Sequence, residues 1–423
     1  MTAIVGTLNR RGIAFAADSA ATLTLSEKSK ITNHANKVFA LSKKHPVGIA
    51  IYNNLDFHGV PWEEIFKMYR NNHLKDNSFP KLVDYADDFW KYVTDCILPK
   101  LADEQNRQVA YMASRLKDEI IVTSRKKLED AGITVDNAAL LSEMEDMLQG
   151  LSTDFSVHNR ALGFDGYEIE DFGRYTASII DSVIGDILKD PDCSADFRER
   201  FQKTLYWIMM STQKVYVSHT GLVFWGYGED ELFPSYYEFH VTLAFDGRVK
   251  RVKTSEYEVS NNQDACVAPF AQTDVANTVV RGIDQELRNT INNGVIDAFD
   301  NFRNSIITEM ENAGAPTVLT DVLAKIDTRM YANSFIDDIN NFIKSKYTDK
   351  LLITVSMLEK EDLAEMAESL VKMTCLKRHV TTDEESVGGP VDVAVITKGD
   401  GFVWIKRKHY FSPDLNQDFI KRN

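Results

Sequence analysis

The stretch TAIVGTLNRRGIAFAADSAAT, residues 2–22, contains two short apolar segments around a polar turn. TAIVGTL (2–8) and GIAFAAD (12–18) flank NRRG (9–12), a pattern that is typical of a β-hairpin. Both segments are too apolar to have one face in water. We therefore expect them to belong to a sheet that is covered on both sides.

Outward from this hairpin, strand-like and helix-like stretches alternate. KVFAL (37–41) and VGIAIY (47–52) predict a second hairpin. From Trp62 to about Ser211 the apolar residues recur at helical steps of three and four, as they do at Leu82, Tyr85, Phe89, Val93 and Ile97. This periodicity predicts a long helical insertion over residues 62–211.

The second half of the chain repeats this change of pattern. Strands are predicted at GLVFWGYG (221–228), YYEFHVTLAF (236–245) and RVKRVK (248–253), the last two joined by an Asp-Gly turn. A second helical block follows over residues 274–376, with one apolar stripe at Val275, Val279, Ile283 and Leu287. VDVAVITKGDGFVWIK (391–406) predicts a closing hairpin.

This order of elements is not the strict βαβ alternation of a parallel sheet. It predicts an α+β fold, a four-layer αββα sandwich in which two antiparallel sheets pack face to face beneath outer helices. Because we find no internal repeat or Pro/Gly-rich linker, we expect residues 1–423 to form a single elaborated domain.

Composition excludes several classes of function. The chain has 423 residues, 44% of them hydrophobic, and a net charge of −15, which argues against a nucleic-acid-binding surface. No signal peptide or membrane-spanning run is recognisable, so we expect a cytoplasmic protein without a membrane partner. The four cysteines form no CxxC pair, so we expect no disulfide framework and no metal site.

Thr2 raises a chemical question. A threonine hydroxyl needs a base to act as a nucleophile, and removal of Met1 would give Thr2 its own α-amino group, with a reference pKa of about 7.7 to 8.0. A nearby lysine would keep that pKa low, and a carboxylate would keep the lysine charged. Asp18 at the end of the second predicted strand and Lys37 at the start of the third supply both groups.

These residues resemble a known family. TAIVGTLNRRGIAFAADSAAT, NKVFAL (36–41) and VGIAIYNNLDF (47–57) resemble the start of proteasome β-type subunits and their bacterial relatives, the N-terminal nucleophile hydrolases. DEESVGGPVDVAVITKGDGFVW (383–404) is similar to the family's Asp-x-x-Ser-Gly-Gly segment and closing hairpin. The family has the αββα sandwich.

The resemblance implies a role for each matching residue. Thr2 would be the nucleophile, its freed amine the general base, and Asp18 would orient Lys37, with Lys30 as the alternative lysine. Asp383 and Ser386 would hydrogen-bond the N-terminal threonine. The backbone N–H of Tyr52, where the family usually has glycine, would donate to the oxyanion. No metal or organic cofactor is implied.

The sequence also departs from the family pattern. Tyr52 removes the room that a glycine would give a bound peptide, Val387 is an added residue, and the 62–211 insertion is too long for an ordinary stacked ring. Three hypotheses follow. The first is a threonine peptidase acting on peptides or proteins as a homo-oligomer, with an unknown unfoldase partner. The others are a catalytically silent homologue, in which Asp18 and Lys37 form only a structural ion pair, and a hydrolase of a small non-peptide amide.

Overall fold

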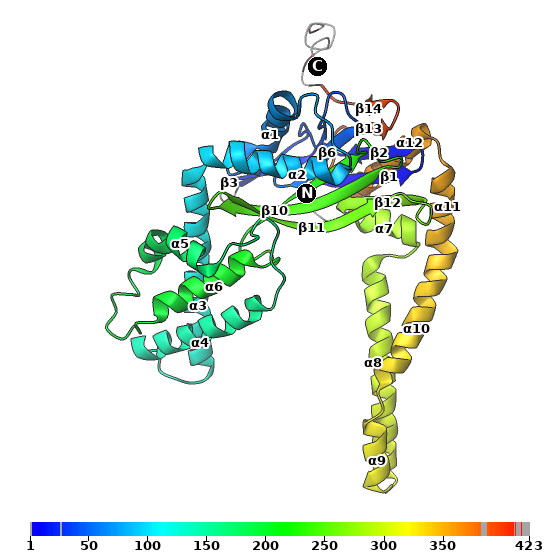
Figure 1. Cartoon of the computed structure of the whole chain (residues 1–423). Coiled ribbons are helices and arrows are strands. Elements are labelled where there is room, and N and C mark those ends of the chain that lie inside the picture. Colours follow the sequence, from blue (N-terminus) through cyan, green and yellow to red (C-terminus); the bar gives the residue numbers. More distant parts are fainter. Residues whose placement is uncertain (1, 26–27, 382–386, 410, 412–415, 417–423) are drawn as a thin grey trace. The chain divides into compact units, whose positions relative to one another are not determined.

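The structure is a computed structural model that describes the chain except residues 1, 26–27, 382–386, 410, 412–415 and 417–423. Figure 1 labels its helices and strands. The chain divides into two compact units. The first unit comprises Met1–Val38 and Glu258–Asn423, and the second unit comprises Phe39–Tyr257.

The first unit is built on a five-stranded sheet with the strand order β12-β1-β2-β13-β14. Neighbouring strands of this sheet are antiparallel, and they are β1 (Ala3–Asn9), β2 (Gly12–Ala17), β12 (Ala265–Ala271), β13 (Asp392–Thr397) and β14 (Gly401–Lys406). The β1–β2 and β13–β14 hairpins are confirmed. Gly6 faces Phe15 across the first hairpin, and a Cβ at Gly6 would lie 2.7 Å from the Phe15 ring.

One face of this sheet packs against α11 (Asp349–Met357) and α12 (Lys360–Val380). The strands present small side chains such as Ala14 and Ala16, and the helix presents larger ones such as Leu370. Two buried polar side chains join the layers, since the Thr7 hydroxyl donates to the Leu363 carbonyl and the Asn9 amide donates to the Val355 carbonyl, each at 2.8 Å. The sheet and its helices therefore share one core.

Two strand elements were not expected from the sequence. β12 contains Pro269, which cannot donate a ladder hydrogen bond, and such a residue is tolerated because β12 is the edge strand of its sheet. A hairpin of β3 (Ala21–Leu25) and β4 (Lys28–Thr32) follows Asp18. The prediction that Lys37 begins the third strand is therefore wrong: Lys37 directly precedes β5 (Val38–Ala40), the fifth.

The second unit contains the other five-stranded sheet, with the order β11-β10-β9-β6-β5. Its remaining strands are β6 (Val47–Asn53), β9 (Thr220–Gly226), β10 (Ser235–Phe245) and β11 (Arg248–Glu258). Asp246 and Gly247, at φ 48° and 67°, form the predicted turn between β10 and β11, as the left-handed positions of a type I′ turn require. β7 (Asp56–Phe57) and β8 (Val60–Pro61) form a small separate pair.

Helical segments from the first part of the predicted insertion cover one face of this sheet. They are α1 (Trp62–Met68), the π-helix η1 (Tyr69–Leu74), α2 (Leu82–Tyr92), the π-helix η2 (Val93–Ile97) and the short η3 (Leu98–Lys100). The periodic residues identified in the sequence are all buried in one core with the strands, namely Leu82, Tyr85, Phe89, Val93 and Ile97. The predicted amphipathic period is confirmed here.

The rest of the insertion forms a group of helices whose core also includes Leu243 and Phe245 of β10. Its helices are α3 (Ala102–Asp130), α4 (Asn137–Ser156), α5 (Ile169–Ile184) and α6 (Phe197–Met210). Buried side chains from all four helices meet in it, including those of Leu116, Leu148, Phe172 and Phe201.

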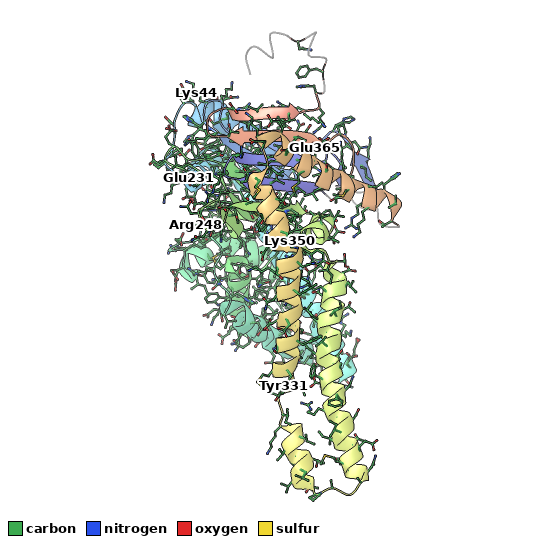
Figure 2. The ribbon with its side chains drawn as sticks, turned by 90° about the vertical axis from the view of Figure 1, so that its right-hand side faces the viewer. Lys44, Glu231, Arg248, Tyr331, Lys350 and Glu365 are labelled. Carbon is green, nitrogen blue, oxygen red and sulfur yellow. The ribbon has the colours of Figure 1, made fainter. Side chains whose placement is uncertain are left out.

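The second helical block contains α7 (Asp274–Arg281), α8 (Gln285–Asn312), α9 (Thr317–Ala324), α10 (Thr328–Ile343) and the π-helix η4 (Lys344–Thr348). The predicted continuous stripe is wrong, because Gly282 at φ 70° ends α7, and Leu287 is 54% exposed. α8 lies alongside α9 and α10 in both views, and we call this pair of antiparallel limbs the arm (Figures 1 and 2). α8 has no buried residue, and Tyr331 on α10 is exposed (Figure 2).

The described residues thus have an α+β fold with two antiparallel sheets, as expected. The four-layer packing of the two sheets and the single domain stay predictions.

Candidate functional site

Asp18 is the centre of a buried hydrogen-bond network in the first unit. Its Oδ1 atom accepts from the backbone N–H of Ala3 at 2.8 Å and from the ammonium group of Lys37 at 2.7 Å. Its Oδ2 atom accepts from the N–H groups of Ala20 at 3.1 Å and Gly388 at 3.0 Å. Four donors therefore fix the carboxylate, and they come from three separate segments of the chain.

Lys37 reaches this network from just before β5. Its ammonium group donates to Asp18 and to the carbonyl of Ala20, and neither side chain of the ion pair is exposed. Burial lowers the pKa of Lys37, while the Asp18 carboxylate opposes that shift. Lys408, which forms its own ion pair with Asp392, lowers the pKa of Lys37 further. Lys30, the alternative lysine, is exposed on β4. The lysine that pairs with Asp18 is Lys37.

Thr2 is attached to the same network through its peptide bond. The Thr2–Ala3 amide donates to Asp18, and the Thr2 carbonyl accepts from the backbone N–H of Gln272 at 3.1 Å. The peptide group that follows Thr2 is therefore held on both sides, by β12 and by the carboxylate. Thr2 itself is 3% exposed.

The segment after β2 is connected to the glycine pair of the closing motif. The Ser19 N–H donates to the Gly388 carbonyl at 3.0 Å, and the Ser19 hydroxyl donates to the carbonyl of Pro390. Gly389 lies at φ 74°, and a Cβ there would lie 2.9 Å from Cβ of Asn33. Gly389 thus allows this segment to pass close to Asn33, while the neighbouring Gly388 N–H reaches Asp18.

The sequence reasoning missed the roles of Ser19 and Gly388. The glycine motif at Gly388 and Gly389 was recognised in the sequence, but roles were assigned to its polar side chains and not to its backbone N–H and carbonyl groups. Asp383 and Ser386, the residues predicted to contact Thr2, lie outside the described residues.

A cavity of about 520 Å³ lies beside this network. Gly388 belongs to both, and the cavity is lined by Ile31, Asn33, Cys375, Leu376, His379, Val387, Gly388 and Gly389. Burial raises the pKa of the Cys375 thiol to about 11, with a further contribution from Asp18 and an opposing one from Lys37. The ion pair is therefore within electrostatic reach of the cavity wall.

Tyr52, the predicted oxyanion residue, lies on β6 in the second unit. Its ring passes over Gly221 on the neighbouring strand, where a Cβ would lie 2.0 Å from the ring. Its hydroxyl donates to Glu238 and contacts Nε2 of His240 at 2.6 Å. The oxyanion role of its backbone N–H stays a prediction.

The polar cluster around the Tyr52 side chain was not found from the sequence. Glu238 also accepts from the Thr254 hydroxyl at 2.8 Å, and the rings of His219 and His240 lie 4.1 Å apart. Burial alone raises the pKa of Glu238, but hydrogen bonds from His240, Tyr52 and Thr254 outweigh it and lower the pKa. These residues lie on three strands, with His219 directly before a fourth, and the sheet brings them together.

Comparison with known proteins gives little further information. No protein-family model matches the sequence, and no curated protein matches it. Among solved structures, the chain titled "Anbu (Gly-1) mutant from Hyphomicrobium sp. strain MC1" has 9% sequence identity over 100% of this chain and 94% of that chain. The TM-score is 0.30, so this likeness carries no argument about fold or function.

Two searches of the described residues were also negative. They contain no group of three or more His, Cys, Asp or Glu side chains that could bind a metal ion. Within the same part of the chain, no helix is both long enough and apolar enough to cross a membrane.

Proposed function

We propose that this protein is a threonine-type N-terminal nucleophile amidohydrolase that uses Thr2 after removal of Met1. The observation that carries the proposal is the sharing of one oxygen atom. Oδ1 of Asp18 accepts both from the Lys37 ammonium and from the amide that follows Thr2. This arrangement supports a short separation between the lysine charge and the N-terminal residue.

The freed α-amine of Thr2 is the general base in this proposal. It takes the hydroxyl proton as Oγ1 attacks the substrate carbonyl, and a backbone N–H, which we assign to Tyr52, stabilises the oxyanion. The tetrahedral intermediate then expels the amine, which takes the proton from the α-amine. Water hydrolyses the resulting ester on Thr2 with the same amine as base.

Lys37 has an electrostatic role in this scheme. A positive charge near the α-amine disfavours its protonated form, so the amine stays available as a base near neutral pH. Asp18 acts through Lys37 and is a positioning residue, because its four hydrogen bonds fix both the ammonium group and the start of β1. Asp383 and Ser386 keep their proposed role as hydrogen-bond partners of Thr2.

The substrate class that we propose is a peptide or protein, cleaved by a homo-oligomer. The arm supports self-association, because it carries exposed apolar side chains such as Phe302, Phe335 and Phe342. Light scattering at micromolar concentration tests the assembly. A multiple of 48.0 kDa is expected for the wild type, and Phe335→Ser with Phe342→Ser should shift it toward the monomer. A wild-type monomer would contradict the assembly but not the chemistry.

A catalytically silent homologue is the second candidate. This candidate is favoured by the four hydrogen bonds that the Asp18 carboxylate accepts, two on each oxygen. A purely structural ion pair would be held in the same way. Intact-mass spectrometry of the purified protein separates the two. The proposal predicts a chain that starts at Thr2, and the Thr2→Ser variant should be processed in the same way. A chain that retains Met1 has no free Thr2 amine and would leave only the silent homologue.

A further inference from the structure

A groove of about 560 Å³ lies in the second unit and does not involve Asp18 or Lys37. Three segments form it: the C-terminal end of α2 with η2, the turn between β10 and β11, and the loop that contains Gly163. Its lining residues are Asp87, Trp90, Lys91, Thr94, Asp95, Gly163, Asp246, Gly247, Arg248, Val249 and Arg251.

Arg251 is the most unusual residue of this groove. Its guanidinium carbon lies 5.4 Å from the centre of the Trp90 ring, and burial lowers its pKa. Among the described residues, no side-chain hydrogen bond or ion pair of Arg251 is present, although Asp87 and Asp165 are within electrostatic range. A partly buried charge without a close partner is costly unless a ligand supplies one.

The backbone makes room for this guanidinium group. Gly163 lies at φ 96°, and a Cβ there would lie 2.8 Å from Nη1 of Arg251 and 2.3 Å from the Val249 carbonyl. Leu162 pairs with Arg251 through backbone hydrogen bonds in both directions. The loop therefore holds Arg251 firmly and still leaves the guanidinium group on the groove wall.

Arg248 provides a second cation in the same groove. Its guanidinium carbon lies 5.0 Å from the centre of the Tyr167 ring, and its one side-chain hydrogen bond within the described chain is a long one, 3.5 Å, to the Gly163 carbonyl. Arg248 is labelled in Figure 2. Elsewhere in the described chain, Arg198 and Arg174 bind carboxylates directly.

Among the described residues, no carboxylate of the groove forms an ion pair within 4.0 Å with either arginine. Asp95 binds Lys91 at 2.6 Å, and Asp246 accepts from the Tyr167 hydroxyl at 2.8 Å. Asp87 is exposed and, among the described residues, forms no ion pair within 4.0 Å. The lining is therefore balanced in formal charge, and what a ligand could satisfy are the guanidinium N–H donors of Arg248 and Arg251, which no carboxylate of the lining binds directly.

We infer that this groove binds a small molecule through one anionic group, a carboxylate or a phosphate, held between Arg248 and Arg251 with the Trp90 ring as an apolar wall. Arginine is suited to this task, because its planar fork donates two parallel hydrogen bonds to either group. A long polyanion is disfavoured, because the three aspartates of the lining and the net charge of −15 repel it.

Titration calorimetry on the full-length protein tests the inference, with succinate and inorganic phosphate as separate probes. One saturable site is expected for at least one probe, and the tighter probe identifies the anion. Arg251→Gln should weaken binding about tenfold or more, and Arg251→Lys should recover only part of it, since a lysine lacks the fork. Arg174→Gln, which removes an already paired arginine, is the matched control and should bind like the wild type.

Two results would overturn the inference. One is the absence of saturable binding for both probes at millimolar concentration, and the other is equal affinity in the wild type and Arg251→Gln. Circular dichroism should show that Arg251→Gln is folded. If it is not folded, Arg248→Gln takes its place. We expect the same tenfold loss of affinity for that variant, and an unchanged affinity would overturn the inference.

Discussion

Two buried lysines, one in each unit, have different partners. Lys37 in the first unit donates to the Asp18 carboxylate and to a carbonyl. Lys250 in the second unit donates, within the described part of the chain, to two carbonyls and no carboxylate: those of Ile208 and Gln213, each at 3.3 Å. Burial lowers the pKa of both, and for Lys250 it lowers the pKa to about 7.

In the proposed mechanism, this difference separates a functional charge from a structural one. Lys250 donates to the carbonyl of Ile208 in the last turn of α6, a place where lysine side chains commonly bind helix carbonyls. Lys37 has a carboxylate that favours its charged form, in a network that includes the amide after Thr2. We therefore assign the electrostatic role to Lys37 alone.

Asp18→Asn should have the largest effect. It removes the only carboxylate bonded to Lys37 among the described residues and places an amide NH₂ where N–H groups already point. Breaking a buried ion pair from one side costs about 3–5 kcal/mol, and we expect a loss of that size together with loss of turnover. Urea unfolding measures the loss. A decrease in the free energy of unfolding of less than about 1 kcal/mol would contradict this prediction, because exposed ion pairs contribute that little.

Lys37→Ala should reduce turnover by about tenfold or more at pH 7, because an α-amine at its reference pKa of about 7.7 to 8.0 is mostly protonated there. Lys250→Met is the matched control, because it removes a buried lysine of similar depth without touching the Asp18 network. Steady-state hydrolysis of a peptide library measures both variants. Equal activities in the two would end the functional distinction between the lysines.

Lys250→Met should change the pH dependence of stability. The folded pKa of Lys250, about 7, lies below its unfolded value of about 10.4, so the unfolded state binds more protons between these values. Wild-type stability should rise with pH across this window and fall as pH decreases toward 7. In Lys250→Met this dependence of the free energy of unfolding on pH is absent. The variant should therefore be more stable than the wild type by a few kcal/mol near pH 7, and this difference should shrink toward pH 10. Thermal unfolding at several pH values measures it, and parallel curves would contradict the assignment.

The α-amine of Thr2 should show the smallest effect. In Lys37→Ala its pKa should rise toward the reference value of about 7.7 to 8.0, because a like charge is lost. NMR titration of the ¹⁵N-labelled N-terminus follows it, and Lys250→Met should leave it unchanged. An α-amine that titrates identically in all three proteins would mean that Lys37 does not influence Thr2.

Much of the fold could be predicted because local patterns agreed with it. The hairpins at β1–β2 and β13–β14 and the helical period of α2 follow from short-range signals. β12 was missed because Pro269 argues against a strand, and only its edge position explains it. The stripe predicted from Val275 to Leu287 was wrong because Gly282, at φ 70°, ends α7 and divides this stretch between α7 and α8.

The site could be predicted only where residue type carried the signal. Asp18 and Lys37 were found because an acid and a base stood in a resembling motif. The N–H groups of Ala20 and Gly388 were not found, because almost every residue has a backbone N–H and the residue type therefore does not show which ones donate to Asp18. The Tyr52 cluster depends on the register that aligns β6, β9 and β10, which no single segment encodes.

Covalent labelling of the mature protein tests the central claim most directly. An epoxyketone or β-lactone probe should modify wild type at Thr2, identified by tandem mass spectrometry of the N-terminal peptide. Thr2→Ala should lose the label and keep the wild-type circular dichroism spectrum, whereas Lys250→Met should be labelled like the wild type. Label that persists elsewhere in folded Thr2→Ala, or a wild-type chain that starts at Thr2 and stays unmodified by both probes, would contradict the assignment of Thr2 as the nucleophile.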